Sequence, residues 1–285
     1  MMPTSGHRAS VRADAEAEAD AADARAGLRT RPARPDELAG VVARFESTWG
    51  VGRSPDHSLM KAIDHAGATV LVAVEERGDD ERAGDGAGAV AAPPAAAPLG
   101  AAFGFLGWNG GLHLHSHMNA VDPSARGRGV GVALKLRQRA ICLAHGVDEV
   151  RWTYDPLIRR NARMNLVRLG AEVIAYHPDF YGELDDAITR NDHSDRFEVR
   201  WRLDSPRTRR ALARGPLPAW RAEGRLALVA DYEQVRANDP AIAARLRAAS
   251  RDAFAALERE PSLRVELDDA GDYVFTHDDP DREAR

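Results

Sequence analysis

The chain has 285 residues, a formal net charge of −5 and an isoelectric point near 6.1. This length suits one large domain, or a domain with a smaller partner. The charge argues against a surface that is basic throughout, which is the usual signature of a general nucleic-acid binder. The single cysteine, Cys142, excludes an internal disulfide framework and fits a reducing compartment, and we expect it to be a buried packing residue.

The first 27 residues look unlike a targeting sequence. They lack the apolar core of a secretory signal, and they carry acidic residues that transit peptides avoid. No apolar run approaches the roughly 20 residues needed to cross a bilayer. The sequence therefore predicts a disordered tail over residues 1–27 and a cytoplasmic protein with neither membrane nor nucleic-acid partners.

The regular pattern begins at Leu28. A short strand precedes a helix that starts at Pro35-Asp36, and another helix is expected to start near Ser54-Pro55-Asp56. The β-branched run "GATVLVAVEE" is typical of a buried strand. Residues 77–100, rich in Gly, Ala, Pro and acid, indicate a flexible insertion. The runs "AAFGFLGW" and "GLHLHSHMNAV" follow as strands of a hairpin.

The next segment alternates helices and strands. A helix of roughly 16 residues is expected to end at Gly146, and it is followed by a strand "VDEVRWTY", a helix "PLIRRNARMNLVRLG" and the strands "AEVIAY" and "RFEVRWRL". This order predicts the α/β class, with a mixed sheet flanked by helices.

Beyond residue 205 the pattern indicates a small α+β extension. Its strongest element is the helix "DPAIAARLRAASRDAFAALERE", with Ile242, Leu246, Ala249 and Ala253 on the expected apolar face. We therefore expect three regions: a tail over 1–27, a main domain over 28–204, and a C-terminal extension over 205–285 that packs on the main domain.

The stretch "VDPSARGRGVGVALKLRQR", residues 121–139, places glycines and arginines directly before a helix. A helix N-terminus carries unpaired N–H groups and the positive end of the macrodipole. Glycines let a bulky anion approach these groups, and arginines add positive charge. The spacing fits neither a P-loop nor a dinucleotide fingerprint. A phosphate group is therefore the expected ligand, and a plain glycine-rich turn is the alternative.

The pattern Arg126-x-x-Gly129-x-Gly131 resembles the acyl-CoA motif Q/R-x-x-G-x-G/A of the GNAT superfamily of N-acetyltransferases. The order of elements over residues 28–204 is similar to the GNAT fold, and downstream strings such as "YHPDFYG" and "SDRFEVRWRLDSP" resemble a poorly characterised branch of predicted acyltransferases with a C-terminal extension. The resemblance implies acetyl-CoA or another acyl-CoA as co-substrate. The residues that it assigns to the donor are Asn119, Ala120, Val121, Arg126, Gly127, Arg128, Gly129, Val130, Gly131, Val132, Asn161 and Asn165.

Catalysis would require a base for the acceptor amine and a proton for the departing thiolate. In GNAT enzymes a carboxylate often lies on the strand before the motif, but here that position falls near His115. We expect His115 or His117 to be the base. The position of the usual acidic tyrosine holds Leu166, so Tyr154 and Tyr181 are the substitutes, Tyr154 among the catalytic candidates and Tyr181 near the acceptor.

The acceptor is expected to be a small primary amine such as an amino acid, held by Asp195, Arg196 and Tyr181. A catalytically inactive acyl-CoA sensor remains the alternative. A third reading uses the alternation of His113, His115 and His117, which places them on one strand face where imidazoles can share a zinc ion. We predict no metal site, and the sequence leaves a homo-oligomer open.

Overall fold

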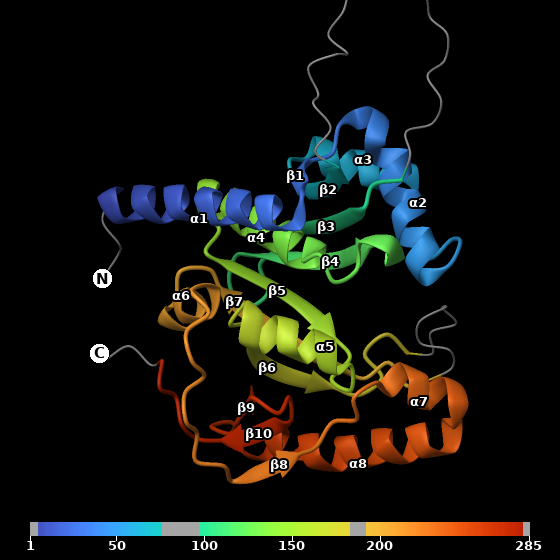
Figure 1. Ribbon diagram of the computed structural model, residues 1–285, viewed down its shortest axis with the longest axis vertical. Coiled ribbons are helices and arrows are strands. Elements are labelled where there is room, and N and C mark those ends of the chain that lie inside the picture. Colours follow the sequence, from blue (N-terminus) through green and yellow to red (C-terminus); the bar gives the residue numbers. More distant parts are fainter. Residues whose placement is uncertain (1–4, 76–96, 183–191, 282–285) are drawn as a thin grey trace, which may run out of the picture. The chain divides into compact units, whose positions relative to one another are not determined.

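The computed structural model describes residues 5–75, 97–182 and 192–281 (Figure 1). Most of the flexible insertion expected at 77–100 lies outside the described residues. The chain divides into two compact units, residues 1–147 and 148–285. The boundary expected at 204/205 therefore falls inside the second unit, which contains the last strands of the expected main domain together with the C-terminal extension.

The first unit contains a four-stranded antiparallel arrangement in the order β1-β2-β3-β4. Its helices are α1 (Ser5–Ala26), α2 (Leu38–Trp49), α3 (His57–His65) and α4 (Val130–Ala144), and its strands are β1 (Leu28–Pro32), β2 (Thr69–Glu75), β3 (Gly100–Gly107) and β4 (His113–Val121). The helix start expected near residue 56 is confirmed, because the Asp56 side chain accepts a hydrogen bond from the N–H of Leu59.

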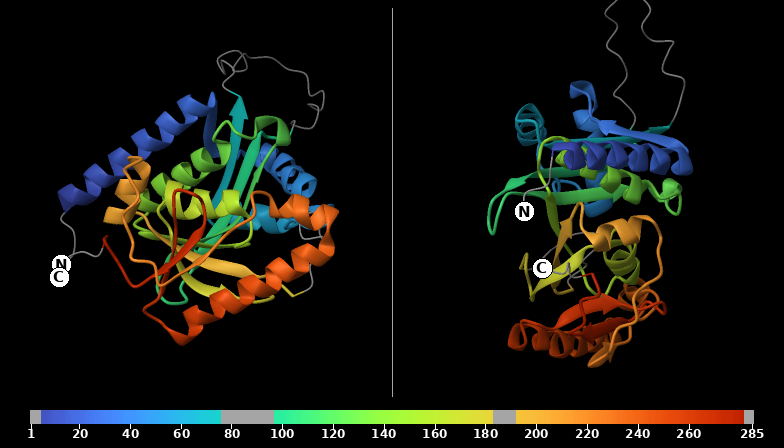
Figure 2. Two further views of the ribbon diagram at one scale, coloured as in Figure 1. Left: turned by 60° about the horizontal axis from the view of Figure 1, so that its bottom comes forward. Right: turned by 90° about the vertical axis from the view of Figure 1, so that its left-hand side faces the viewer.

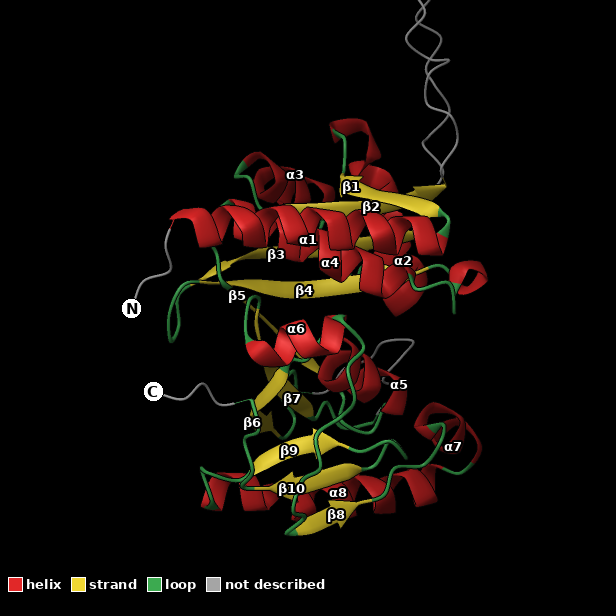
Figure 3. Ribbon diagram, turned by 60° about the vertical axis from the view of Figure 1, so that its left-hand side comes forward, coloured by secondary structure: helices red, strands yellow, loops and turns green. Residues whose placement is uncertain are grey.

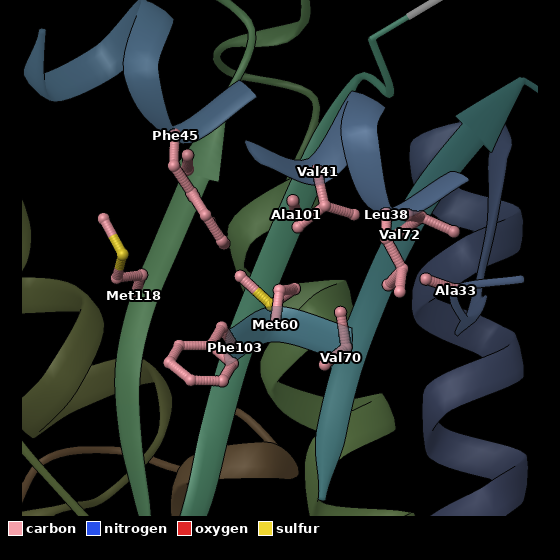
Figure 4. Close-up of a cluster of buried hydrophobic side chains, with 11 residues drawn as sticks. Ala33, Leu38, Val41, Phe45, Met60, Val70, Val72, Ala101, Phe103 and Met118 are labelled. Atoms are coloured by element: carbon pink, nitrogen blue, oxygen red, sulfur yellow. The ribbon is translucent and has the colours of Figure 1, made fainter. Parts of the chain in front are cut away.

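Alternating side chains of the strands serve the two faces of this sheet. Val70, Val72 and Phe103 join the buried cluster formed with α2 and α3, together with Leu38, Val41, Phe45, Met60, Ala101 and Met118 (Figure 4). Residues of the other parity face α4. A Cβ built at Gly104 would lie 3.0 Å from the amide nitrogen of Gln138 in α4. Gly104 therefore lets α4 approach the sheet closely.

The disordered tail predicted for residues 1–27 is wrong for residues 5–26, which form the 22-residue helix α1. Figures 2 and 3 show this helix running alongside α4. Its buried residues are the alanines Ala15, Ala19, Ala22 and Ala26, at helical spacing, together with Asp23. A stripe without large apolar side chains resembles a solvated segment in sequence, but it allows two helices to pack closely.

The second unit contains the three strands β5 (Glu149–Tyr154), β7 (Arg196–Arg202) and β6 (Glu172–His177), paired in the order β5-β7-β6. A separate three-stranded sheet has the order β8-β10-β9. The remaining elements are α5 (Arg159–Ala162), a π-helical turn (Arg163–Arg168), α6 (Pro206–Leu212), β8 (Gly224–Leu226), α7 (Tyr232–Asn238), α8 (Pro240–Arg259), β9 (Arg264–Leu267) and β10 (Tyr273–Thr276).

Helix α8 attaches the C-terminal extension to the β5-β7-β6 strands. Phe254 of α8 packs on Phe197 of β7 and on Tyr273 of β10, with ring centroids 4.5 and 5.6 Å apart. The face of α8 expected from the sequence is wrong, because the buried residues are Ala243, Arg247, Ser250 and Phe254, whereas Ile242 remains 39% exposed. The buried face includes an arginine, which a count of apolar residues assigns to solvent.

Within the part of the chain that the structure describes, no helix is both long enough and apolar enough to span a membrane.

Candidate active site

The glycine–arginine loop leads directly into α4, as the sequence predicts. Gly127 and Gly129 adopt positive φ angles of 83° and 94°, and Gly129 is the N-cap of α4. The backbone N–H groups of Gly127, Gly129, Val130 and Gly131 have no hydrogen-bond partner among the described residues. A Cβ at Gly127 or Gly129 would meet no atom within 4 Å. The loop thus presents open, unpaired donors at the positive end of a 15-residue helix.

Side-chain contacts fix both ends of this loop. Asp122, where the loop starts, accepts hydrogen bonds from Ser124 and pairs with Arg44 of α2 at 2.5 Å. At the other end, the Asn119 amide on β4 donates to the carbonyl oxygen of Gly131 at 3.2 Å. The Asn119 side chain therefore ties the strand to the first turn of α4, while Ala120 and Val130 are buried.

The two arginines of the motif have different surroundings. Arg126 is exposed and its side chain makes no hydrogen bond or ion pair with any other described residue. Arg128 instead donates to the carbonyl oxygens of Ala26 and Gly27, at 3.0–3.1 Å, and pairs with Glu75 at 3.2 Å. Arg126 is therefore available to an anion, whereas the guanidinium of Arg128 is already used.

A β-bulge on β4 positions the candidate base. Phe103 pairs with Met118 and Gly104 with Ser116, so that His117 is the extra residue. The bulge brings His117 close to His115 and Phe105, with ring centroids 5.9 and 6.0 Å away. Although His117 remains exposed to solvent at one edge, the surrounding rings desolvate it and lower its pKa from the ordinary value. The imidazole is therefore neutral at neutral pH and can accept a proton.

His113 is the first residue of β4. Its ring is buried, and Nδ1 lies 2.8 Å from the carbonyl oxygen of Gly111. Within residues 5–75, 97–182 and 192–281, no group of three or more His, Cys, Asp and Glu side chains is arranged to hold a metal ion. The histidine strand thus offers a candidate base.

The buried centre beneath β4 was not foreseen from the sequence. Lys135 of α4 is 3% exposed, and its Nζ donates to the Ser116 hydroxyl at 2.7 Å. Burial lowers the pKa of Lys135 to about 7, whereas burial raises the pKa of Cys142 to about 12. The expected packing role of Cys142 is confirmed. A lysine inside an amphipathic helix pattern gives no signal of burial, because lysines usually lie on the solvated face.

Tyr154 is not placed as a general acid. The side chain is buried, and its hydroxyl lies 3.2 Å from that of Tyr273, which donates to the carbonyl oxygen of Pro156 at 2.8 Å. Burial raises the pKa of Tyr154 above its ordinary value. The structure corrects this assignment, since a buried phenol packed on the C-terminal sheet has no access to a substrate.

The residues expected to bind the acceptor differ in burial and in hydrogen-bond partners. Asp195 is fully buried and accepts hydrogen bonds from Arg251 of α8, at 2.5 and 2.9 Å, and from Tyr176 at 2.7 Å. These contacts hold it as a structural carboxylate, which corrects its assignment to the substrate. Arg196 lies over the ring of the half-exposed Tyr181, with Cζ 5.4 Å from the ring centroid. The pair is partly exposed, although Arg196 also donates to the carbonyl oxygen of Asp195 at 2.8 Å and the Tyr181 hydroxyl lies 3.1 Å from that of Thr153.

The two asparagines expected near the donor also differ. Asn165 is buried in the π-helical turn and accepts a hydrogen bond from the Trp152 indole at 3.3 Å. It therefore has a structural partner. Asn161 is half-buried and its side chain has no partner among the described residues. Leu166, at the position of the usual acidic tyrosine, is buried as expected for a packing residue.

The succession of elements from β1 to β7, with α4 opening after the glycine loop, confirms the GNAT-like fold expected from the sequence. No protein-family model matches the chain, and no curated protein is similar to it. Solved structures do show similarity. One is yncA of Salmonella typhimurium, solved with acetyl-CoA, at a TM-score of 0.45 and 17% identity, over 62% of this chain and 94% of that one.

Two further structures show the same degree of similarity. The ribosomal-protein-S18-alanine N-acetyltransferase of Escherichia coli has a TM-score of 0.45 and 10% identity, over 62% of this chain and 94% of its own. An N-acetyltransferase of Staphylococcus aureus Mu50 has a TM-score of 0.45 and 13% identity, over 62% and 99%. At such identities these similarities concern the fold alone.

Proposed function

We propose that this protein is an acyl-CoA-dependent N-acyltransferase. The observation that carries the proposal is the set of unpaired backbone N–H groups of Gly127, Gly129, Val130 and Gly131, at the N-terminus of α4 and in the same loop as the exposed Arg126. Such a concave set of donors suits the pyrophosphate of coenzyme A. Acetyl-CoA is the default donor, and succinyl or another acyl group is compatible with the same handle.

In the proposed reaction the nitrogen of a neutral amine attacks the thioester carbonyl carbon. A C–N bond forms, the C–S bond breaks, and the sulfur leaves as a thiolate that gains a proton to become the thiol. The amine loses its proton to His117, directly or through His115 or water. The depressed pKa of His117 supports this role, because a neutral imidazole is ready to accept the proton.

The acceptor in this proposal is a small primary amine such as an amino acid. The partly exposed guanidinium of Arg196 supports an acceptor that carries a carboxylate, since a guanidinium forms charge-assisted hydrogen bonds with one. One of its donors is already used by the carbonyl oxygen of Asp195, at 2.8 Å. Asp195 takes no part, because Arg251 and Tyr176 already occupy its oxygens.

A thiol-release assay over a panel of amines with acetyl-CoA and succinyl-CoA tests the proposal. Acceptor-dependent release of free coenzyme A is expected, together with an acylated amine of the matching mass. Binding of coenzyme A without release, for every donor and amine, would instead identify the protein as an acyl-CoA sensor. The burial of Tyr154 and the leucine at position 166 favour this second function, because a buried phenol cannot reach the thiolate and a leucine has no proton to give.

A further inference from the structure

Three arginines in and just before α4 hold α1 against that helix. Arg137 contacts the carboxylates of Glu16, Asp20 and Asp23 at 2.6–3.1 Å, and Arg139 pairs with Glu18 at 2.5 Å. The third is Arg128, which lies in the proposed donor loop. The helix that forms the donor site is therefore also the docking surface for α1.

Arg128 contacts the very end of α1. The last residue of this helix is Ala26, and the carbonyl groups of Ala26 and Gly27 accept three hydrogen bonds from the Arg128 guanidinium. Carbonyl groups at a helix C-terminus lack intrahelical partners and carry the negative end of the macrodipole. A guanidinium donates hydrogen bonds to these carbonyl groups from its rigid fork of N–H groups, and its positive charge is favourable at the negative end of the macrodipole.

The same residue is the anchor at the middle of the donor loop. Arg128 lies between Gly127 and Gly129, which both have positive φ angles and open surroundings. Two such glycines give the free loop a large conformational entropy, and ordering the loop for a ligand costs free energy. The contacts of Arg128 with α1 and Glu75 restrict the backbone between the glycines, so part of this cost is met before the ligand arrives.

We propose that Arg128 is a positioning residue that couples the docking of α1 to the binding of the acyl-CoA donor. Arg126 supplies the charge for the phosphates, whereas Arg128 holds the loop in its binding conformation by capping α1. Because coupling between two binding events is reciprocal, the donor should also strengthen the attachment of α1. This inference rests on the proposed function of the loop.

The test combines titration of coenzyme A by calorimetry with hydrogen exchange of α1, in the full chain. The variants are Arg128→Ala, Arg128→Lys and, as the matched control, Arg126→Ala. In the wild type, coenzyme A should slow exchange in the last turns of α1. Arg128→Ala should speed this exchange without ligand, remove its response to coenzyme A, and weaken affinity about tenfold.

The control variants separate position from charge. Arg128→Lys keeps the charge but loses the fork, so it should behave like Arg128→Ala. Arg126→Ala should weaken coenzyme A binding while the exchange of α1 without ligand stays at the wild-type rate. Unchanged α1 exchange in Arg128→Ala, or faster exchange with unchanged affinity, would overturn the coupling. If the wild type does not bind coenzyme A, both the coupling and the proposed function are overturned. This result is distinct from the two outcomes for Arg128→Ala.

Discussion

Arg247 of α8 donates paired hydrogen bonds to Asp155, from Nη1 to Oδ1 at 2.9 Å and from Nη2 to Oδ2 at 2.8 Å. Nη2 also reaches Asp192 at 2.7 Å. The arginine is 1% exposed, and its partners lie directly after β5 and shortly before β7. One buried cation thus joins the C-terminal extension to both of these strands.

Replacing this cation should destabilise the second unit strongly. Arg247→Ala leaves Asp155 without its cation and Asp192 with only Arg236, at 3.4 Å, and breaking such a buried pair typically costs about 3–5 kcal/mol. Urea unfolding followed by tryptophan fluorescence measures the loss. Arg245→Ala, on the exposed side of the same helix, is the matched control and should change the free energy of unfolding by less than about 0.5 kcal/mol. Equal stability of the two variants would contradict this assignment.

Sequence patterns predicted the strands and helices of the sheet because their apolar residues follow the expected periods. They failed for α1, whose buried residues are four alanines and Asp23 and whose carboxylates pair with Arg137 and Arg139. They also misplaced the face of α8, because Arg247 is buried by partners that are distant in sequence. Both errors have one cause: ion pairs between distant segments leave no periodic signal in either segment.

The candidate site shows the same limit. The motif identified the loop, since glycine spacing before a helix is a local property. The difference in role between Arg126 and Arg128 is not a local property, because it depends on where residues 26 and 27 lie in the fold. The structural role of Asp195 likewise depends on its hydrogen bond with Arg251, which lies more than fifty residues away in the sequence.

The buried lysine should make stability depend on pH. Burial lowers the pKa of Lys135 to about 7, against an ordinary value of 10.5. Between these values the unfolded chain binds one proton more than the folded chain, so the free energy of unfolding should rise with pH, by up to about 1.4 kcal/mol per pH unit. Lys135→Met should lose this rise. Lys61, the other lysine of the chain and exposed on α3, is the control.

Denaturant titrations at pH 6.5, 8 and 9.5 compare the three proteins. The expected result is that wild type and Lys61→Met gain stability over this range, relative to Lys135→Met. Parallel pH curves for all three proteins would show that Lys135 is protonated in the folded state at neutral pH.

Replacing Tyr154 should leave catalysis nearly unchanged, because Tyr154 is not the general acid. Its hydroxyl contacts Tyr273 inside the protein, so Tyr154→Phe should leave the acyl-transfer rate within about twofold and lower the free energy of unfolding by about 1 kcal/mol. Tyr181→Phe is the informative partner, because Tyr181 is 40% exposed. A large loss of rate in Tyr154→Phe, with the fold intact, would return it to the list of acids.

The donor loop should not tolerate an acidic side chain. Gly129→Asp adds a like charge beside the expected phosphates and strains a backbone with a φ angle of 94°. We expect coenzyme A binding to fall by more than about tenfold. Gly67→Asp introduces comparable strain at a φ angle of 83°, in a turn before β2 with open surroundings, and should leave binding intact. Equal affinity of both folded variants would remove the loop from the donor site.

The pH dependence of the rate should report His117. Because surrounding rings lower the pKa of His117, the base stays neutral as the pH falls through the ordinary histidine range. The value of kcat/KM should therefore decline only below about pH 6.5.

His117→Gln should lower kcat/KM about a hundredfold and abolish this acidic limb. His115→Gln should change the rate less, because His117 is the base in the proposed reaction, and His65→Gln, exposed on α3, is the control. If His115→Gln alone removes the acidic limb, then His115 is the base, and His117 serves to position it.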